Sequence, residues 1–178
     1  MSGKPKMLAY RGIYLLCGLI LVALPLLPLQ FSPERLATPE LLFAFTFVWV
    51  VRQPDTAPFL LVALLALLAD SVLMRPLGLW AFLFVIAIEI TRYSYMGIQE
   101  RGVLMELSLF VALLVAMSII QSLLLWASFS QGLDLRTNTQ FVMRTALVYP
   151  VMLVFIHYIL RVRKPDHSNR PDRLGKIR

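Results

Sequence analysis

Long apolar stretches separated by short polar ones dominate the chain. Six of them have the character of membrane-crossing helices, running over 13–29, 39–51, 57–74, 77–90, 103–129 and 141–160. A helix needs roughly 20 residues to cross about 30 Å of hydrocarbon, so the second and fourth stretches must tilt or be shielded by their neighbours. The pattern predicts an all-α, polytopic membrane protein with six transmembrane helices.

The composition favours the same class of protein. Hydrophobic residues make up 59% of the 178 residues and charged residues 15%, whereas soluble domains are roughly half apolar and one quarter charged. A soluble globule of this size buries only about 70% of the surface that its unfolded chain exposes. The excess apolar surface therefore requires hydrocarbon as its solvent.

The positions of the seventeen Lys and Arg residues predict a topology. Because these residues are retained on the cytoplasmic side, six spans with the N-terminus inside would leave thirteen of them in the cytoplasm. An odd number of spans would export one of the two basic ends. We expect a cytoplasmic N-terminus over 1–12, a transmembrane domain over 13–160, and a basic, disordered cytoplasmic tail over 161–178. A docking peptide for a cytoplasmic partner is the alternative for the tail.

The formal charge of +7 changes the expected partners little. The basic residues lie at the ends of apolar stretches instead of forming a face on a water-exposed domain, so we expect anionic lipids as partners and no nucleic acid. The first apolar stretch runs through Pro25 and Pro28 without a small-x-small cleavage site. We therefore interpret it as a retained span of an inner-membrane protein and not as a signal peptide.

Charged residues within a span are informative because each costs a few kcal/mol unless it is paired or hydrated. Asp70 precedes the Arg75-Pro76-Leu77-Gly78 segment, and Arg144 enters the last span at a similar depth. We hypothesise that Asp70 pairs with Arg75 or Arg144 and thereby fixes a helical hairpin. Pro76 and Gly78 would form its short turn. A ligand or proton site is the alternative for Asp70.

Other polar residues predict further contacts within the membrane. Glu89 with Arg92, and Glu106 with Arg101, have the spacing of local ion pairs at the head-group level. Ser118, Gln121 and Ser122 share one helical face, so we expect them to hydrogen-bond to another helix or, alternatively, to line a polar cavity. The three tryptophans lie near span ends, as in an interfacial belt: Trp49, Trp80 and Trp126.

Catalytic motifs are missing from the sequence. It contains no Gly-x-Ser-x-Gly turn, no His-Glu-x-x-His helix, no phosphate loop and a single cysteine. Only two histidines are available for a catalytic or metal site. We expect a protein that is not an enzyme and that uses no cofactor or metal.

The segment from Ala66 to Leu73, Ala-Leu-Leu-Ala-Asp-Ser-Val-Leu, is followed by Arg-Pro-Leu-Gly-Leu-Trp-Ala from Arg75 to Ala81. This motif, the six-span layout and the basic ends resemble the rod shape-determining MreD family. Family members often have glycine at the position of Ala66, so this chain departs from the pattern there.

The resemblance implies a fold similar to the substrate-capture (S component) subunits of energy-coupling-factor transporters. It also implies a non-enzymatic scaffold of the bacterial elongation (Rod) complex, which organises peptidoglycan synthesis and rod cell shape. The implied partners are MreC most directly, then MreB, RodA and a class B penicillin-binding protein. The alternative function is a substrate-binding membrane subunit of a vitamin-type transporter.

Overall fold

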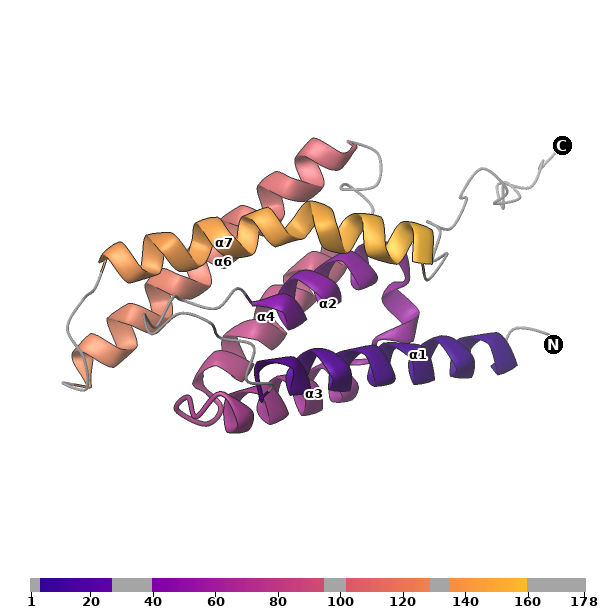
Figure 1. Cartoon of the computed structure of the whole chain (residues 1–178), viewed down its shortest axis with the longest axis horizontal. Helices are drawn as coiled ribbons and strands as arrows, with labels where there is room; N and C mark the ends of the chain where they lie inside the picture. Colours follow the sequence, from indigo (N-terminus) through magenta and orange to yellow (C-terminus); the bar gives the residue numbers. More distant parts are fainter. Residues whose placement is uncertain (1–3, 27–39, 95–101, 129–134, 160–178) are drawn as a thin grey trace, which may run out of the picture.

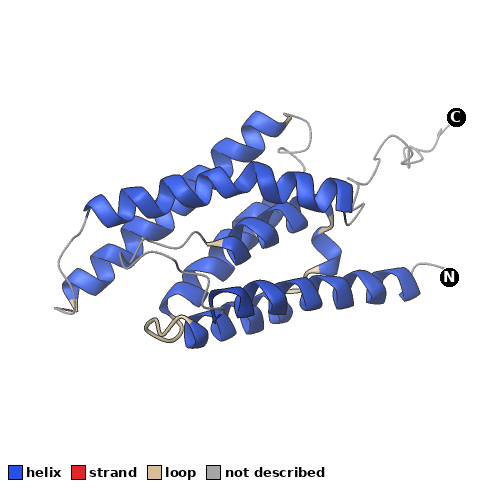
Figure 2. Cartoon of the chain, in the orientation of Figure 1, coloured by secondary structure: helices blue, strands red, loops and turns tan. Residues whose placement is uncertain are grey.

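The computed structural model describes residues 4–26, 40–94, 102–128 and 135–159, and every element in these ranges is helical. The α-helices are α1 (Lys4–Ala23), α2 (Leu41–Arg52), α3 (Phe59–Val72), α4 (Leu79–Tyr93), α6 (Val103–Ala127) and α7 (Leu135–Val154). Short helical turns follow three of them, namely η1 (Leu24–Leu26), η2 (Pro54–Thr56) and the π-helical η3 (Phe155–Ile159). Figures 1 and 2 show the helices as one elongated bundle.

Helix α2 occupies the centre of the bundle. Its sequence is apolar on all sides, which is typical of a helix without a solvent-facing surface, and every residue from Leu42 to Arg52 is buried. It packs against α1, α4 and α7, while α1–α3, α3–α4, α4–α6 and α6–α7 are neighbouring pairs around it. This 12-residue helix is thus enclosed by the helices around it.

Aromatic side chains fill the contact between α2 and its neighbours. Phe43 stacks on Phe110 of α6 with 5.4 Å between ring centroids, and Phe47 meets the same ring edge-on at 5.1 Å. Tyr149 of α7 lies 5.0 Å from Phe110. Such aromatic pairs add to the burial of apolar area through their preferred stacked and edge-on geometries.

The predicted helical hairpin is present. Helix α3 ends at Val72 and α4 begins at Leu79, and the two helices pack together. Gly78 has a φ of +87°, a left-handed conformation that glycine adopts without steric cost. Pro76 and Gly78 thus lie in the turn, as the sequence predicted.

Helices occupy all six stretches expected to be spans, although their bounds differ. Helix α1 begins at Lys4, inside the segment expected as a cytoplasmic N-terminus, and α7 begins at Leu135, before its apolar core. Within the described ranges, two helical segments are long and apolar enough to cross a bilayer, Met7–Leu26 and Val103–Ala127, while Leu41–Arg52 and Phe59–Val72 are apolar but shorter. The tail over 161–178 lies outside the described residues.

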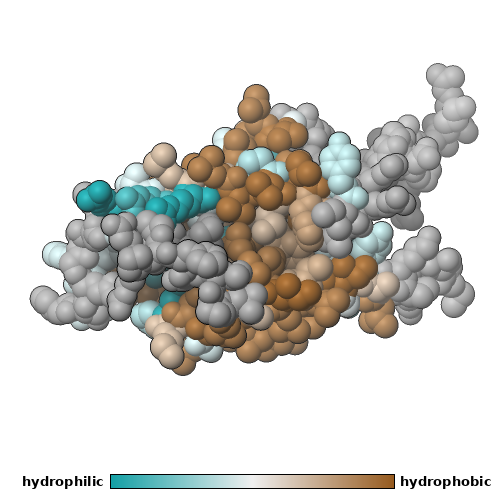
Figure 3. Space-filling model, in the orientation of Figure 1, coloured by the Kyte–Doolittle hydropathy of each residue, from teal (hydrophilic) through white to brown (hydrophobic). Residues whose placement is uncertain are grey.

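The surface of the bundle is largely apolar. Figure 3 shows hydrophobic side chains over the middle of one face and hydrophilic ones gathered over the first part of α7. Trp126 is 57% exposed, but Trp49 and Trp80 are buried. The prediction of an interfacial tryptophan belt was therefore wrong for these two residues, because both pack into the interior.

Candidate functional site

Asp70 lies fully buried near the end of α3, and its side chain hydrogen-bonds to the backbone at the start of α4. Its Oδ2 accepts hydrogen bonds from the backbone N–H groups of Gly78 at 3.0 Å and Ala81 at 3.1 Å. The first N–H groups of a helix have no intrahelical partner and favour a negative charge nearby. The carboxylate therefore caps α4 from the preceding helix and fixes the hairpin.

Arg75 pairs with a carboxylate that the sequence argument missed. Its Nη1 lies 2.9 Å from Oε2 of Glu40, which immediately precedes α2. The guanidinium also lies over the Trp80 ring, 5.2 Å from the centroid, in the geometry of a cation–π contact. The expected pairing of Asp70 with Arg75 was wrong. Arg75 extends toward Glu40 at the start of α2, while the Asp70 side chain accepts hydrogen bonds from backbone N–H groups.

Arg144 does not replace Arg75 as the partner of Asp70 within the described residues. Its side chain is half-buried on α7 and has other interactions. The contact from α7 to this region comes instead from Thr145, whose Oγ1 accepts a hydrogen bond from the Glu40 backbone N–H at 3.1 Å. The hairpin, the start of α2 and α7 are thus joined near Glu40.

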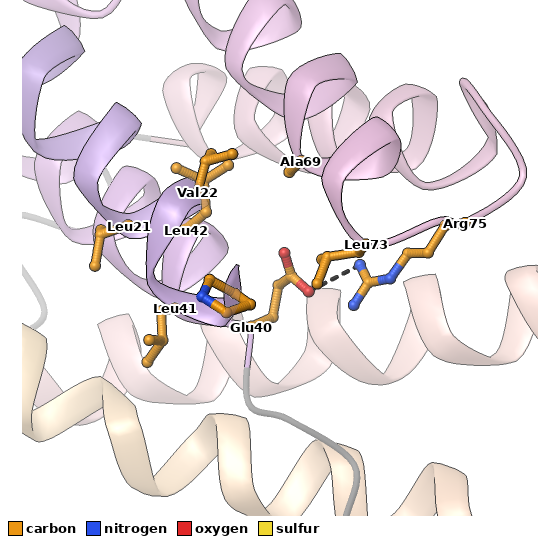
Figure 4. A pocket seen from close by; sticks show the side chains of 9 residues that line it. Leu21, Val22, Glu40, Leu41, Leu42, Ala69, Leu73 and Arg75 are labelled. Atoms are coloured by element: carbon orange, nitrogen blue, oxygen red, sulfur yellow. Dashed lines mark ion pairs between the residues drawn. The ribbon is translucent and has the colours of Figure 1, made fainter. Parts of the chain in front are cut away.

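A small cavity borders this group of charges. It lies between α1, the start of α2 and the end of α3, and its walls combine leucine side chains with Glu40 and Arg75, which face each other in Figure 4. Its volume is about 30 Å³. That is enough for one or two water molecules.

A second buried ion pair lies toward the other end of α2. Nη1 of Arg52 donates to Oε1 of Glu106 on α6 at 2.9 Å and to the Val48 carbonyl at 3.0 Å. Both side chains are almost wholly buried, with 5% and 0% exposure. The interpretation of Glu106 as a local head-group charge was wrong, because it is an interior partner of α2. Arg101, its expected partner, lies outside the described residues.

The pairing of Glu89 with Arg92 is confirmed. Their side chains meet at 3.0 Å within α4 and remain partly exposed. Arg92 also donates to the backbone carbonyl of Ala57 before α3. This pair therefore tethers the end of α4 to the segment that precedes α3.

The polar face of α6 forms one contact between helices. Nδ2 of Asn138 on α7 donates to Oγ of Ser122. Ser118 and Ser122 also donate to carbonyls of their own helix, at Leu114 and Ser118 respectively. The expected hydrogen bond to another helix is thus present at Ser122. Ser118 is buried, and Gln121 is half-buried.

Among the residues that the structure describes, the buried charges join elements of the bundle. Among the described residues, no group of three or more His, Cys, Asp or Glu side chains is placed to hold a metal ion. Glu40 and Arg52 were missed as interior residues because each lies at the end of an apolar stretch, where a charge ordinarily faces the head groups. No family model, curated protein or solved structure matches this chain.

Proposed function

We propose that this protein is a non-enzymatic, six-span scaffold of a bacterial inner membrane that acts by binding other membrane proteins. Its role would be that of the MreD-type subunit of the elongation complex, which the motif around Asp70 resembles. MreC is the first proposed partner, with MreB, RodA and a class B penicillin-binding protein as further members of the assembly.

The proposal rests on one observation, namely that the interior charges are paired or hydrogen-bonded within the protein. Glu40–Arg75 joins α2 to the hairpin, Arg52–Glu106 joins α2 to α6, and Asp70 caps α4. Ionisable groups inside a membrane are costly and usually mark either chemistry or neutralised structural pairs. Here each has a protein partner, which favours a rigid body that offers its surface for binding.

The arrangement of the helices supports membrane embedding with both ends on one side. The start of α1 and the end of α7 lie at the same end of the bundle (Figure 1). The outward surface carries leucine, isoleucine and phenylalanine on α1, α3, α4, α6 and α7. A bilayer, or the membrane helix of a partner, would cover such a surface.

The cavity beside Glu40 and Arg75 is too small to be the ligand pocket of a transport subunit. A transport subunit needs a pocket that encloses its ligand, and small-molecule pockets have volumes of about 300–1,000 Å³. The cavity beside Glu40 and Arg75 has about 30 Å³. Purification of a transport subunit would recover a bound small molecule, whereas a scaffold would retain a membrane partner.

Capture of the partner tests the proposal directly. The full chain, expressed at native level with an affinity tag, should co-purify MreC in mild detergent, and its depletion should round up rod-shaped cells. Glu106→Gln should weaken capture by destabilising the bundle, while Glu89→Gln, at the partly exposed pair, serves as the matched control. Absence of MreC from the purified wild-type protein, with normal cell shape after depletion, would refute the assignment.

The membrane topology needs a separate measurement. Fusions of a cytoplasm-active and a periplasm-active reporter to each chain end should both report the cytoplasm. Reporters on opposite sides of the bilayer would exclude an even number of spans and with it the proposed six-span arrangement.

A further inference from the structure

The turn between α3 and α4 has its apolar side chains outside and its charges inside. Met74 is 94% exposed and Leu77 is 73% exposed. Arg75, between them, turns inward to Glu40 and the Trp80 ring. Turns that face water usually show the opposite distribution, with polar side chains outward.

Met74 has a backbone conformation that is strained for a residue other than glycine. Its φ of +50° is left-handed, and its N–H donates to the Ser71 carbonyl while that of Arg75 donates to the Asp70 carbonyl. This is the C-terminal arrangement of a helix in which glycine or asparagine is favoured. At 94% exposure, the Met74 side chain contributes almost nothing to the interior of the chain.

Most backbone N–H groups of the turn have an acceptor within the chain. The N–H of Leu73 donates to the Ala69 carbonyl, and that of Leu79 donates to the Pro76 carbonyl. The N–H groups of Gly78 and Ala81 donate to Asp70, and Pro76 has no N–H. Hydrocarbon offers no hydrogen bonds, so acceptors within the chain favour a turn at that depth.

The hairpin does not extend as far as the α6–α7 pair. Helix α3 has 14 residues and α6 has 25, which correspond to roughly 21 and 38 Å at 1.5 Å per residue. In Figure 2 the α3–α4 turn stops short of the end of the α6–α7 pair. At that end α7 begins with exposed Arg136 and Thr137, and Figure 3 shows hydrophilic side chains gathered there. The polar level of this end therefore lies beyond the turn.

We propose that the α3–α4 turn is immersed in the hydrocarbon of the bilayer, where Met74 and Leu77 contact lipid acyl chains below the head groups. The proposal rests on the membrane embedding proposed above. It adds that, on the side formed by α3 and α4, the protein ends within the bilayer and does not reach its surface. Asp70 accepts hydrogen bonds from the backbone N–H groups of Gly78 and Ala81, and Glu40 neutralises the charge of Arg75. These groups therefore do not depend on water.

Collision measurements on spin labels test the depth of the turn. Single-cysteine variants of the full chain, Met74→Cys and Leu77→Cys in a Cys17→Ser background, are labelled and reconstituted in bilayers of dioleoyl phosphatidylcholine and phosphatidylglycerol. Oxygen concentrates in hydrocarbon, whereas a nickel chelate stays in water. The oxygen-to-nickel collision ratio at both positions should exceed that of Asp55→Cys several-fold and approach that of Leu64→Cys, halfway along α3.

The two reference positions separate the possible failures. If Leu64→Cys reports hydrocarbon while Met74→Cys and Leu77→Cys report water, the immersed turn is refuted and the membrane embedding stands. A bilayer thinned down to the turn would also give nickel contact there and would refute immersion. If Leu64→Cys itself reports water, the proposed embedding fails as well.

Two substitutions at Met74 test whether its side chain anchors the turn in the hydrocarbon, and neither strains the backbone. Glycine and asparagine both tolerate the left-handed conformation, so Met74→Gly and Met74→Asn should fold. With the label at Leu77→Cys, asparagine should lower the oxygen-to-nickel ratio more than glycine, because an amide draws the turn toward water. Identical ratios in the two variants would overturn the anchoring role.

Discussion

Removal of the Glu106 charge should destabilise the bundle far more than removal of the Glu89 charge. Glu106 is fully buried and is held by Arg52 at 2.9 Å, whereas Glu89 is 40% exposed and pairs within its own helix. Breaking a buried pair by neutralising one partner costs about 3–5 kcal/mol, because the other charge stays buried without compensation. An exposed pair within one helix contributes about 0.3–0.5 kcal/mol.

These free energies translate into separable melting temperatures. For a chain of this length 1 kcal/mol corresponds to roughly 2–4 °C, so Glu106→Gln should lower the melting temperature by about 6–20 °C and Glu89→Gln by less than about 2 °C. The assay is the loss of the monodisperse peak in size-exclusion chromatography after heating in one detergent.

A double replacement tests the mechanism of this loss. Arg52→Met combined with Glu106→Leu removes both charges and keeps apolar volume, and such replacements are often neutral or stabilising. The double variant should recover most of the stability lost in Glu106→Gln. Equal losses in Glu106→Gln and Glu89→Gln, or a double variant less stable than either, would refute the reasoning.

Three further predictions concern the hairpin and the loop after α2. Asp70→Ala should cost about 1–3 kcal/mol because the N–H groups of Gly78 and Ala81 lose their acceptor. Asp70→Asn, which keeps a carbonyl oxygen, should lose less stability, and thermal unfolding of the two variants checks this order. Gly78→Ala should cost about 1 kcal/mol from its left-handed backbone, and unchanged stability would contradict the turn geometry. Trp49→Phe should cost more than about 1 kcal/mol, because it removes the hydrogen bond from Nε1 to Thr56 Oγ1 and part of a fully buried ring. Thr56→Val should lower stability further in the same assay, because Oγ1 also donates to the Gln53 carbonyl.

The sequence by itself was sufficient to locate the helices. An apolar stretch, a proline and a left-handed glycine act over a few residues, so α3, the turn through Pro76 and Gly78, and α4 could be predicted in order. The i,i+3 pair of Glu89 and Arg92 was predictable for the same reason, since its geometry is set within one helix.

Tertiary structure alone decided which charges meet and which faces are buried. Arg52 and Glu106 lie 54 residues apart, and nothing in the local pattern joins them. In a helix that is apolar all round, the hydrophobic period does not mark an inner face, so the burial of Trp49 and the central place of α2 followed only from packing against α1, α4 and α7. Long-range pairing depends on how whole helices are arranged, and a local pattern does not record that arrangement.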